Sequence, residues 1–366
     1  MSRRRKLILD DGSVYEGVGF GGKRETVCEI VFNTSMAGYQ EILSDPSYTD
    51  QGIVMSYPLI GNYGITNEDD ESRILSPSAL IVRDLNENPS NFRSVRTVSD
   101  LLEERNIPGI AGIDTRKLVR SIRDLGSRRA LVTDADISVE EGLRILRETP
   151  VPHDAVRRCS CRKKWYSRTS NPAFQVAAVD CGMKSNIVRM LNKNKCNVTI
   201  VPYDTGWEEI LSLAPDGVLI SNGPGDPQDV PEVIETLRNL RGKVPLMGIC
   251  LGHQLLALSF GAKTYKLKFG HRGGNHPVKE LSTGKIEITS QNHSYAVEAE
   301  SLDGTGLKVS HINVLDGTVE GLCSDTENVF SAQFHPESAP GPQDSMHLFG
   351  RFCDMMRRAD RGFVSV

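Results

Sequence analysis

Gly248-Ile249-Cys250-Leu251-Gly252 joins an apolar segment to a helical pattern, and the prediction of the fold starts from these five residues. Residues 243–247 before it form a short apolar run typical of a buried strand, and residues 253–260 after it have the pattern of a helix. Where a strand turns abruptly into a helix, the turn residue is strained, and glycines two positions before and after it remove side chains that would clash. The pattern predicts a nucleophile elbow with Cys250 at a helix N-terminus, where the helix dipole favours the thiolate. A buried cysteine between two packing glycines is the alternative that this short pattern leaves open.

Length and composition are those of an ordinary globular chain. The 366 residues are 39% hydrophobic and 25% charged with a net charge of −4, which predicts two or three domains and gives no reason to expect nucleic acid or a membrane as partner. No apolar run approaches the ~20 residues of a transmembrane helix, and the basic residues 3–6 do not begin a secretory signal. Eight cysteines are scattered without a C-x-x-C pair, which favours reduced thiols in the cytoplasm over disulfides or structural zinc.

The first 150 residues predict a mixed α+β domain. Short apolar segments between residues 7 and 83 indicate strands, and Asp114 begins a helix that runs to Leu125. A capping box at residues 138–141 opens another helix. Residues 151–172 are rich in proline, arginine and lysine and poor in apolar residues, which predicts a linker. Its two cysteines, Cys159 and Cys161, carry no predicted role.

From residue 173 to residue 366 the pattern changes to alternating strands and helices. Strands are indicated at residues 176–179, 198–201 and 217–220, each followed by a helical segment, and then come the elbow and a β-rich region. Such alternation with short connections predicts a doubly wound parallel sheet. Sites in these sheets lie at the carboxyl ends of the strands, where Cys181 and Cys250 both fall.

His335-Pro336-Glu337 offers the base that a thiolate nucleophile needs and a carboxylate to orient that base. The segment follows an apolar strand at residues 329–334, so a parallel sheet can bring His335 to Cys250. A strand-end histidine with a capping glutamate is the alternative, and a metal site is disfavoured because a third ligand is not evident. Cys181 is a rival nucleophile, but it lacks a glycine two positions earlier.

Residues 221–227, Ser-Asn-Gly-Pro-Gly-Asp-Pro, form a glycine-rich loop at another predicted strand end. The chain has no G-x-x-x-x-G-K-[ST], so a phosphate cradle is disfavoured. Backbone N–H groups of the loop fit an oxyanion hole beside the elbow better. A plain surface turn is the alternative reading of these residues.

Two sets of motifs resemble a known family. Residues 248–254 (GICLGHQ) together with residues 335–337 (HPE) resemble the triad-type, or class I, glutamine amidotransferase domain. Residues 32–48, 58–64 and 109–116 resemble the amino-terminal domain of the small subunit of carbamoyl-phosphate synthetase. The resemblance covers nearly the whole chain and is weakest in the predicted linker.

This resemblance implies a division of labour between two subunits. This chain would hydrolyse L-glutamine through a cysteine thioester and deliver ammonia to a large subunit, which makes carbamoyl phosphate from bicarbonate and ATP for arginine and pyrimidine biosynthesis. The partners would form a cytoplasmic heterodimer, or a higher assembly of it. No cofactor is expected in this chain, since ATP and Mg²⁺ belong to the large partner. The implied organisation is a small-subunit N-terminal domain at 1–150, a linker at 151–172 and a class I amidotransferase domain with a Cys-His-Glu triad at 173–366.

The resemblance also implies roles for single residues. Cys250 would be the nucleophile, His335 the general acid and base, and Glu337 the orienting carboxylate, with no metal. The backbone N–H groups of Leu251 and Gly223 would form the oxyanion hole. The residues implied to bind the amino-acid end of glutamine are Ser35, Gly225, Gln254, Asn292, Ser294 and Tyr295. Ser294 departs from the family, which usually has glycine at that position.

Two other functions stay open from the sequence. The chain could be the amidotransferase subunit of a different synthase, such as those that make anthranilate or GMP, although the first domain argues against this. It could also be a regulatory binding subunit whose triad is inactive.

Overall fold

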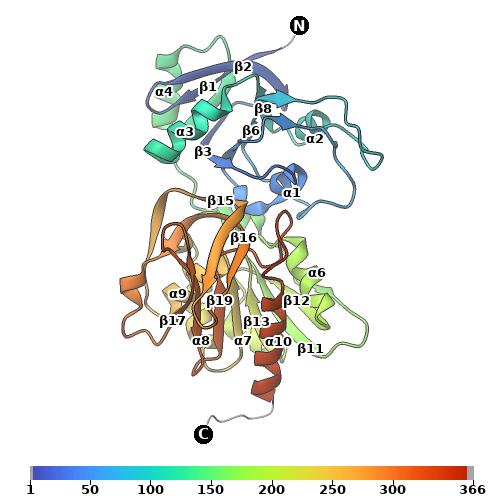
Figure 1. The fold of residues 1–366 in the computed structure, drawn as a ribbon, viewed down its shortest axis with the longest axis vertical. Coiled ribbons are helices and arrows are strands. Elements are labelled where there is room, and N and C mark those ends of the chain that lie inside the picture. Colours follow the sequence, from blue (N-terminus) through green and yellow to red (C-terminus); the bar gives the residue numbers. More distant parts are fainter. Residues whose placement is uncertain (1–2, 361–366) are drawn as a thin grey trace. The chain divides into compact units, whose positions relative to one another are not determined.

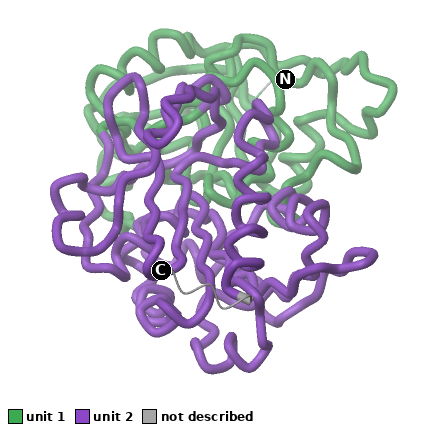
Figure 2. The backbone as a smooth tube through the Cα atoms, turned by 60° about the horizontal axis from the view of Figure 1, so that its bottom comes forward, with its two compact units in different colours: residues 1–152, 268–272 green, residues 153–267, 273–366 purple. Residues whose placement is uncertain are grey.

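The computed structural model describes residues 3–360, and the chain divides into two compact units (Figure 2). Met1–Pro152 with Lys268–Arg272 form the first unit, and His153–Leu267 with Gly273–Val366 form the second. The division after residue 152 lies next to the boundary predicted at residue 150. In the part of the chain that the structure describes, no helix combines the length and the apolar character needed to cross a bilayer.

The first unit is built on a closed barrel of seven strands (Figure 1). Their order is β1 (Arg4–Leu9), β2 (Val14–Gly21), β8 (Pro108–Ala111), β6 (Ala79–Ile81), β4 (Gln51–Met55), β3 (Thr26–Asn33) and β9 (Arg128–Asp134). The pairs β3–β4, β4–β6 and β6–β8 are parallel, whereas the other four are antiparallel. A separate parallel pair consists of β5 (Leu59–Ile60) and β7 (Asp84–Leu85).

Helices complete the first unit and confirm its mixed α+β class. They are α1 (Tyr39–Ser44), the 3₁₀ turn η1 (Pro46–Tyr48), α2 (Val98–Glu104), α3 (Thr115–Leu125) and α4 (Val139–Glu148). The caps predicted for α3 and α4 are present, because Asp114 accepts from the Lys117 N–H and Ser138 accepts from the Glu141 N–H.

The second unit contains a ten-stranded sheet. Its order is β10 (Trp165–Ser167), β12 (Cys196–Pro202), β11 (Phe174–Asp180), β13 (Gly217–Ile220), β14 (Leu246–Ile249), β19 (Val329–Ala332), β18 (Val319–Ser324), β16 (Ile286–Val297), β15 (Thr264–Glu280) and β17 (Lys308–Asn313). The central strands from β12 to β19 pair in parallel. The β-rich region that follows α9 (Leu251–Ser259) forms the antiparallel side of the same sheet.

Helices cover both faces of the parallel strands, as the doubly wound prediction requires. One buried cluster joins Ala177 and Val179 of β11 to α7 (Trp207–Ser212), α8 (Pro231–Leu240) and α9 (Leu251–Ser259). A second cluster joins the alternate residues Val176 and Ala178 to α6 (Ser185–Lys193) and α10 (His347–Asp360). Successive side chains of a strand point to opposite faces, so the two clusters lie on opposite sides of the sheet. Two 3₁₀ turns, η2 (Pro227–Asp229) and η3 (Ala299–Leu302), lie in connections of this unit.

The segment predicted as a linker, residues 151–172, is instead largely part of the second unit. It contains α5 (Ala155–Cys159) and the strand β10, which pairs antiparallel with β12. Ala155, Val156 and Cys159 are buried, while the arginines and lysines around them are mostly exposed. A few buried positions therefore order a stretch whose average composition is polar, and composition alone could not reveal them.

The predicted elbow lies between β14 and α9. Cys250 has φ 53° and ψ −103°, a left-handed φ that a residue with a side chain rarely adopts. A Cβ placed on Gly248 would lie 2.5 Å from the Gly252 carbonyl oxygen, and one on Gly252 would lie 2.3 Å from the Ile220 carbonyl oxygen. Both distances are far inside van der Waals contact. The two glycines are therefore needed for the strand, the turn and the helix to pack as closely as they do.

We predict that Gly248→Ala and Gly252→Ala each destabilise the second unit by about 1–3 kcal/mol, because the new methyl group must push backbone apart. Gly350→Ala in α10 is the matched control, since its Cβ would meet nothing within 4 Å. That change should stabilise by about 0.5–1 kcal/mol through helix propensity. Both tryptophans, Trp165 and Trp207, belong to this unit, so urea unfolding followed by tryptophan fluorescence measures it. Unchanged midpoints for both elbow variants would contradict the steric argument.

Candidate active site

Cys250 is held at the end of β14 beside the neighbouring strand β19. Its N–H donates to the Ala332 carbonyl at 2.8 Å, and its carbonyl accepts the His253 N–H at 3.1 Å in the first turn of α9. The side chain is 2% exposed. The sulfur has two polar neighbours: the thiol donates to the Asn292 carbonyl at 3.5 Å, and Sγ accepts from Gln333 Nε2 at 3.7 Å. The elbow therefore places the sulfur in a polar, enclosed setting, not in an apolar core.

His335 follows β19, the strand paired in parallel with β14. Its N–H donates to the Ser290 carbonyl at 2.9 Å, and its ring Nδ1 lies 2.7 Å from Glu337 Oε1. The other ring nitrogen, Nε2, is buried and has no hydrogen-bond partner among residues 3–360. With Nδ1 carrying a proton for the carboxylate, Nε2 is the nitrogen left to exchange a proton with a nucleophile or a substrate.

The electrostatics of His335 favour its charged form. Burial by itself lowers the pKa of the imidazole, but the negative charges of Glu337 and Cys250 outweigh burial and raise this pKa to about 10. Cys250 thus acts on the ring of His335. The arrangement therefore places a charged imidazole beside the sulfur, as is found where a cysteine serves as nucleophile.

Glu337 is fully buried and is held from a second side by Lys184, which lies beyond the end of β11. Lys184 Nζ lies 3.0 Å from Glu337 Oε1 and donates to the Ser338 carbonyl at 2.6 Å. Burial raises the pKa of the Glu337 carboxyl, but the charges of Lys184 and His335 prevail and lower it to about 2. No motif in the sequence indicated Lys184. Its position just past a parallel strand was the one signal that could have indicated it.

The glycine-rich loop after β13 lies against the elbow. A Cβ on Gly223 would be 2.2 Å from the Cys181 carbonyl oxygen and 2.8 Å from Leu251 Cδ2, so the Gly223 backbone is packed beside the first residue of α9. Neither the Gly223 N–H nor the Leu251 N–H donates a hydrogen bond to another described residue. Ser221 and Asn222 are fully buried. The loop therefore has the location and the free donors that an oxyanion hole requires.

Three of the residues expected to bind glutamine, Asn292, Ser294 and Tyr295, lie on β16. Gln254 on α9 joins them, since its Nε2 donates to the Tyr295 carbonyl at 2.9 Å and to Gln333 Oε1 at 3.0 Å. The Asn292 carbonyl contacts the sulfur, as described above. Ser294 and Tyr295 are half-buried. The structure thus brings Asn292 to the sulfur and Gln254 to Tyr295, while Ser294 lies on the same strand.

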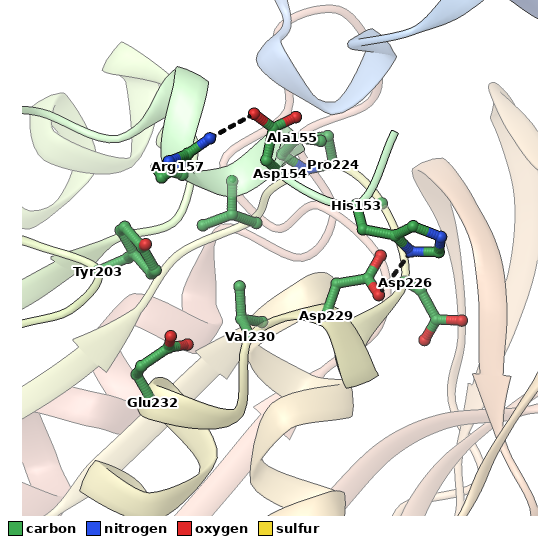
Figure 3. A pocket seen from close by; sticks show the side chains of 12 residues that line it. His153, Asp154, Ala155, Arg157, Tyr203, Pro224, Asp226, Asp229, Val230 and Glu232 are labelled. Atoms are coloured by element: carbon green, nitrogen blue, oxygen red, sulfur yellow. Dashed lines mark hydrogen bonds and ion pairs between the residues drawn. The ribbon is translucent and has the colours of Figure 1, made fainter. Parts of the chain in front are cut away.

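Gly225 and Ser35 are not brought to the sulfur by any contact within one unit. Gly225, with φ 87°, lines a cavity of about 180 Å³ together with Pro224, Asp226 and residues of α5 (Figure 3). The lining of this cavity does not include Cys250. Ser35 belongs to the first unit, where its N–H donates to Asn33 Oδ1 at 2.7 Å. Glutamine binding by these two residues stays a prediction.

The rival nucleophile Cys181 is poorly suited to that role. Its side chain is fully buried, and burial together with the Asp180 carboxylate raises the pKa of its thiol far above the ordinary value. Its N–H donates to Ser221 Oγ at 2.9 Å, which ties it to the glycine-rich loop. Burial, followed by Asp180, also raises the pKa of the nearby Cys161 to about 12. Both thiols are therefore structural rather than reactive.

The chain matches the models of two protein families. Residues 177–355 match the family described as glutamine amidotransferase class-I. Residues 7–132 match the family described as carbamoyl-phosphate synthase small chain, CPSase domain. The first match covers the elbow, the His-Pro-Glu segment and the strands that hold them. The second covers all seven strands of the barrel, apart from a few terminal residues.

Curated relatives match along nearly the whole chain. The carbamoyl phosphate synthase small chain of Listeria innocua is 51% identical over 98% of this chain and 98% of its own length. The pyrimidine-specific small chain of Halalkalibacterium halodurans is 54% identical over 96% of this chain and 97% of its own. The pyrimidine-specific small chain of Bacillus subtilis is 50% identical over 98% of this chain and 97% of its own length. With the elbow and the paired histidine and glutamate in place, this chain belongs to the carbamoyl phosphate synthase small chain family.

Proposed function

We propose that this chain is the glutaminase subunit of a glutamine-hydrolysing carbamoyl-phosphate synthetase. The observation that carries the proposal is the arrangement of Cys250 on a strained elbow beside the linked pair His335 and Glu337. Family membership supports the same conclusion, since the relatives are named as small chains of that enzyme. The domain match at residues 7–132 disfavours a subunit of an anthranilate or GMP synthase.

The proposed reaction begins with attack of the Cys250 thiolate on the carboxamide carbon of L-glutamine. The oxyanion that forms accepts hydrogen bonds from the N–H groups of Leu251 and Gly223. Nε2–H of His335 protonates the amide nitrogen, the C–N bond breaks, and ammonia leaves behind a thioester. Neutral His335 then takes a proton from water as the water attacks the thioester, and glutamate and the thiolate are released.

Substrate orientation is assigned to the residues around Gln254. Nε2 is the donor in both hydrogen bonds of the Gln254 amide. Its Oε1 can therefore accept a hydrogen bond from the α-ammonium group of glutamine. Asn292, Ser294 and Tyr295 supply backbone and side-chain groups on the neighbouring strand. Ser35 and Gly225 are proposed to complete the site at the amino-acid end. A polar set of this kind suits a zwitterion better than a cluster of net charge does.

The ammonia is proposed to pass to a large subunit that binds ATP and Mg²⁺ and makes carbamoyl phosphate from bicarbonate. The two chains would form a heterodimer, and this chain would need no cofactor of its own. Two of the relatives carry pyrimidine-specific names, which favours a role in pyrimidine biosynthesis, with arginine biosynthesis as the second outlet.

Replacing the nucleophile tests the proposal. In the complex with its large subunit, Cys250→Ser should lower glutamine-dependent carbamoyl phosphate synthesis by about 10³-fold or more, because the hydroxyl is a far weaker nucleophile. Synthesis from added ammonia should persist, because it bypasses this site. Cys323→Ser in β18 is the matched control and should leave both activities intact.

Two outcomes of this experiment would contradict the proposal. Loss of ammonia-dependent synthesis in Cys250→Ser would contradict the separation of the two sites. Absence of glutamate release by the wild-type complex, with no labelling of Cys250 by an alkylating glutamine analogue, would favour an inactive regulatory subunit.

The buried pair of Lys184 and Glu337 predicts a pH-dependent stability. The pKa of Glu337 is about 2 in the folded chain and lies near 4.5 in an unfolded one, so its contribution to stability is present above pH 4.5 and is lost as the pH falls toward 2. Lys184→Met removes the largest influence that lowers this pKa, and it should destabilise the second unit by about 3 kcal/mol at neutral pH. The difference in unfolding free energy between Lys184→Met and the wild type should become smaller below pH 4.5.

Lys285→Met is the control for that experiment. Lys285 lies 2.7 Å from Glu287, but its side chain is 62% exposed, so its loss should lower the free energy of unfolding far less than the loss of Lys184 does, at any pH. Urea unfolding between pH 7 and pH 3, followed by tryptophan fluorescence, measures both variants. If the loss of unfolding free energy in Lys184→Met stays constant across this pH range, the effect cannot be assigned to Glu337.

A further inference from the structure

The buried amide of Gln333 lies between the nucleophile and the residue proposed to orient the substrate. Gln333 follows β19 directly and is fully buried. Its N–H donates to the Glu320 carbonyl at 2.8 Å, which fixes its backbone to β18. Its side-chain Nε2 donates to Cys250 Sγ at 3.7 Å, and its Oε1 accepts from Gln254 Nε2 at 3.0 Å. One side chain therefore contacts both the sulfur and Gln254.

The Tyr295 backbone carbonyl sets which end of each amide in this hydrogen-bond chain donates and which end accepts. Gln254 Nε2 also donates to the Tyr295 backbone carbonyl at 2.9 Å, and a carbonyl can only accept. The NH₂ of Gln254 must therefore face Tyr295 and Gln333. This in turn requires the oxygen of the Gln333 amide to face Gln254, so that its NH₂ faces the sulfur. The Tyr295 carbonyl thus determines that the sulfur meets a donor.

We propose that Gln333 is a positioning residue of the glutaminase reaction, which holds the Cys250 sulfur with its amide NH₂ and keeps Oε1 of Gln254 turned toward the substrate. This inference rests on the proposed function. A hydrogen bond to a thiolate stabilises the charged form of the sulfur and limits its rotation. Because Gln333 Oε1 accepts from Gln254 Nε2, the Gln254 amide cannot flip. A flipped amide would present its NH₂, a donor, to the α-ammonium group. The same amide therefore serves nucleophile and substrate recognition together.

Two substitutions separate this role from ordinary packing. Gln333→Glu keeps the shape of the side chain and still accepts from Gln254, but it places a second acidic group beside the thiol. The negative charge of the new carboxylate disfavours ionisation of the Cys250 thiol. The pH midpoint for alkylation of Cys250 should therefore rise by one unit or more. Gln333→Met keeps a similar length but removes both hydrogen bonds. Its alkylation midpoint should rise less, while KM for glutamine should increase about tenfold.

Ser331→Ala is the matched control, because Ser331 is equally buried on β19 and its Oγ lies 2.9 Å from His253 Nδ1 on α9, without contact with the sulfur. The complex with the large subunit is used throughout. Iodoacetamide labelling of Cys250, read by peptide mass spectrometry from pH 5 to pH 10, gives the alkylation midpoint without needing turnover. Steady-state glutaminase assays then give KM and kcat separately.

The results distinguish this inference from the proposed function. Two results together would overturn the positioning role: alkylation midpoints of both Gln333 variants at the same pH as that of Ser331→Ala, and KM values within twofold of its KM. A wild-type complex that hydrolyses no glutamine and shows no selective labelling of Cys250 would instead overturn the proposed function. Loss of activity in the variants with an unchanged alkylation midpoint and an unchanged KM would assign Gln333 to packing alone and would also overturn the inference.

Discussion

The active site is built around the backbone conformation of Cys250. A positive φ at the end of β14 lets the chain turn from strand to helix within one residue. Gly248 and Gly252 pack so closely against neighbouring backbone that neither position has room for a side chain. This turn sets the direction of the sulfur relative to the sheet, and it also leaves the Leu251 N–H at the start of α9 without an acceptor among residues 3–360. The nucleophile and a donor for the oxyanion are therefore consequences of the same local geometry.

Around that turn the site is a sequence of alternating charges in a region from which water is largely excluded. Lys184 faces Glu337, Glu337 faces His335, and His335 faces the sulfur. Each ionised group would be costly to bury alone, and each is supported by its neighbour. The opposite pKa shifts of Glu337 and His335 express this mutual support, since burial opposes both and the neighbouring charges prevail in both. This series of charges keeps a charged imidazole beside the nucleophile.

The parts of the structure that could be predicted from the sequence are those set by local pattern. The elbow, the strand–helix alternation and the helices capped by Asp114 and Ser138 all follow from neighbouring residues and are present. Closure of the barrel in the first unit depends on parallel pairings between distant strands, which no local pattern encodes. Lys184 and Gln333 were missed for the same reason, because their significance comes from what they meet across the sheet. Residues 151–172 show a third limit, where average polarity concealed three buried apolar side chains.

Strand order explains why groups so distant in sequence meet at one sulfur. β14 lies between β13 and β19 in the sheet, so its carboxyl end is flanked by the loop that carries Gly223 and by the segment that carries Gln333 and His335. Both neighbours run parallel to β14, and all three strands therefore deliver their following residues to the same edge. A nucleophile on an outer strand would have only one such neighbour. Placing Cys250 on a central strand allows the oxyanion donors to come from one side while the base and its supporting carboxylate come from the other.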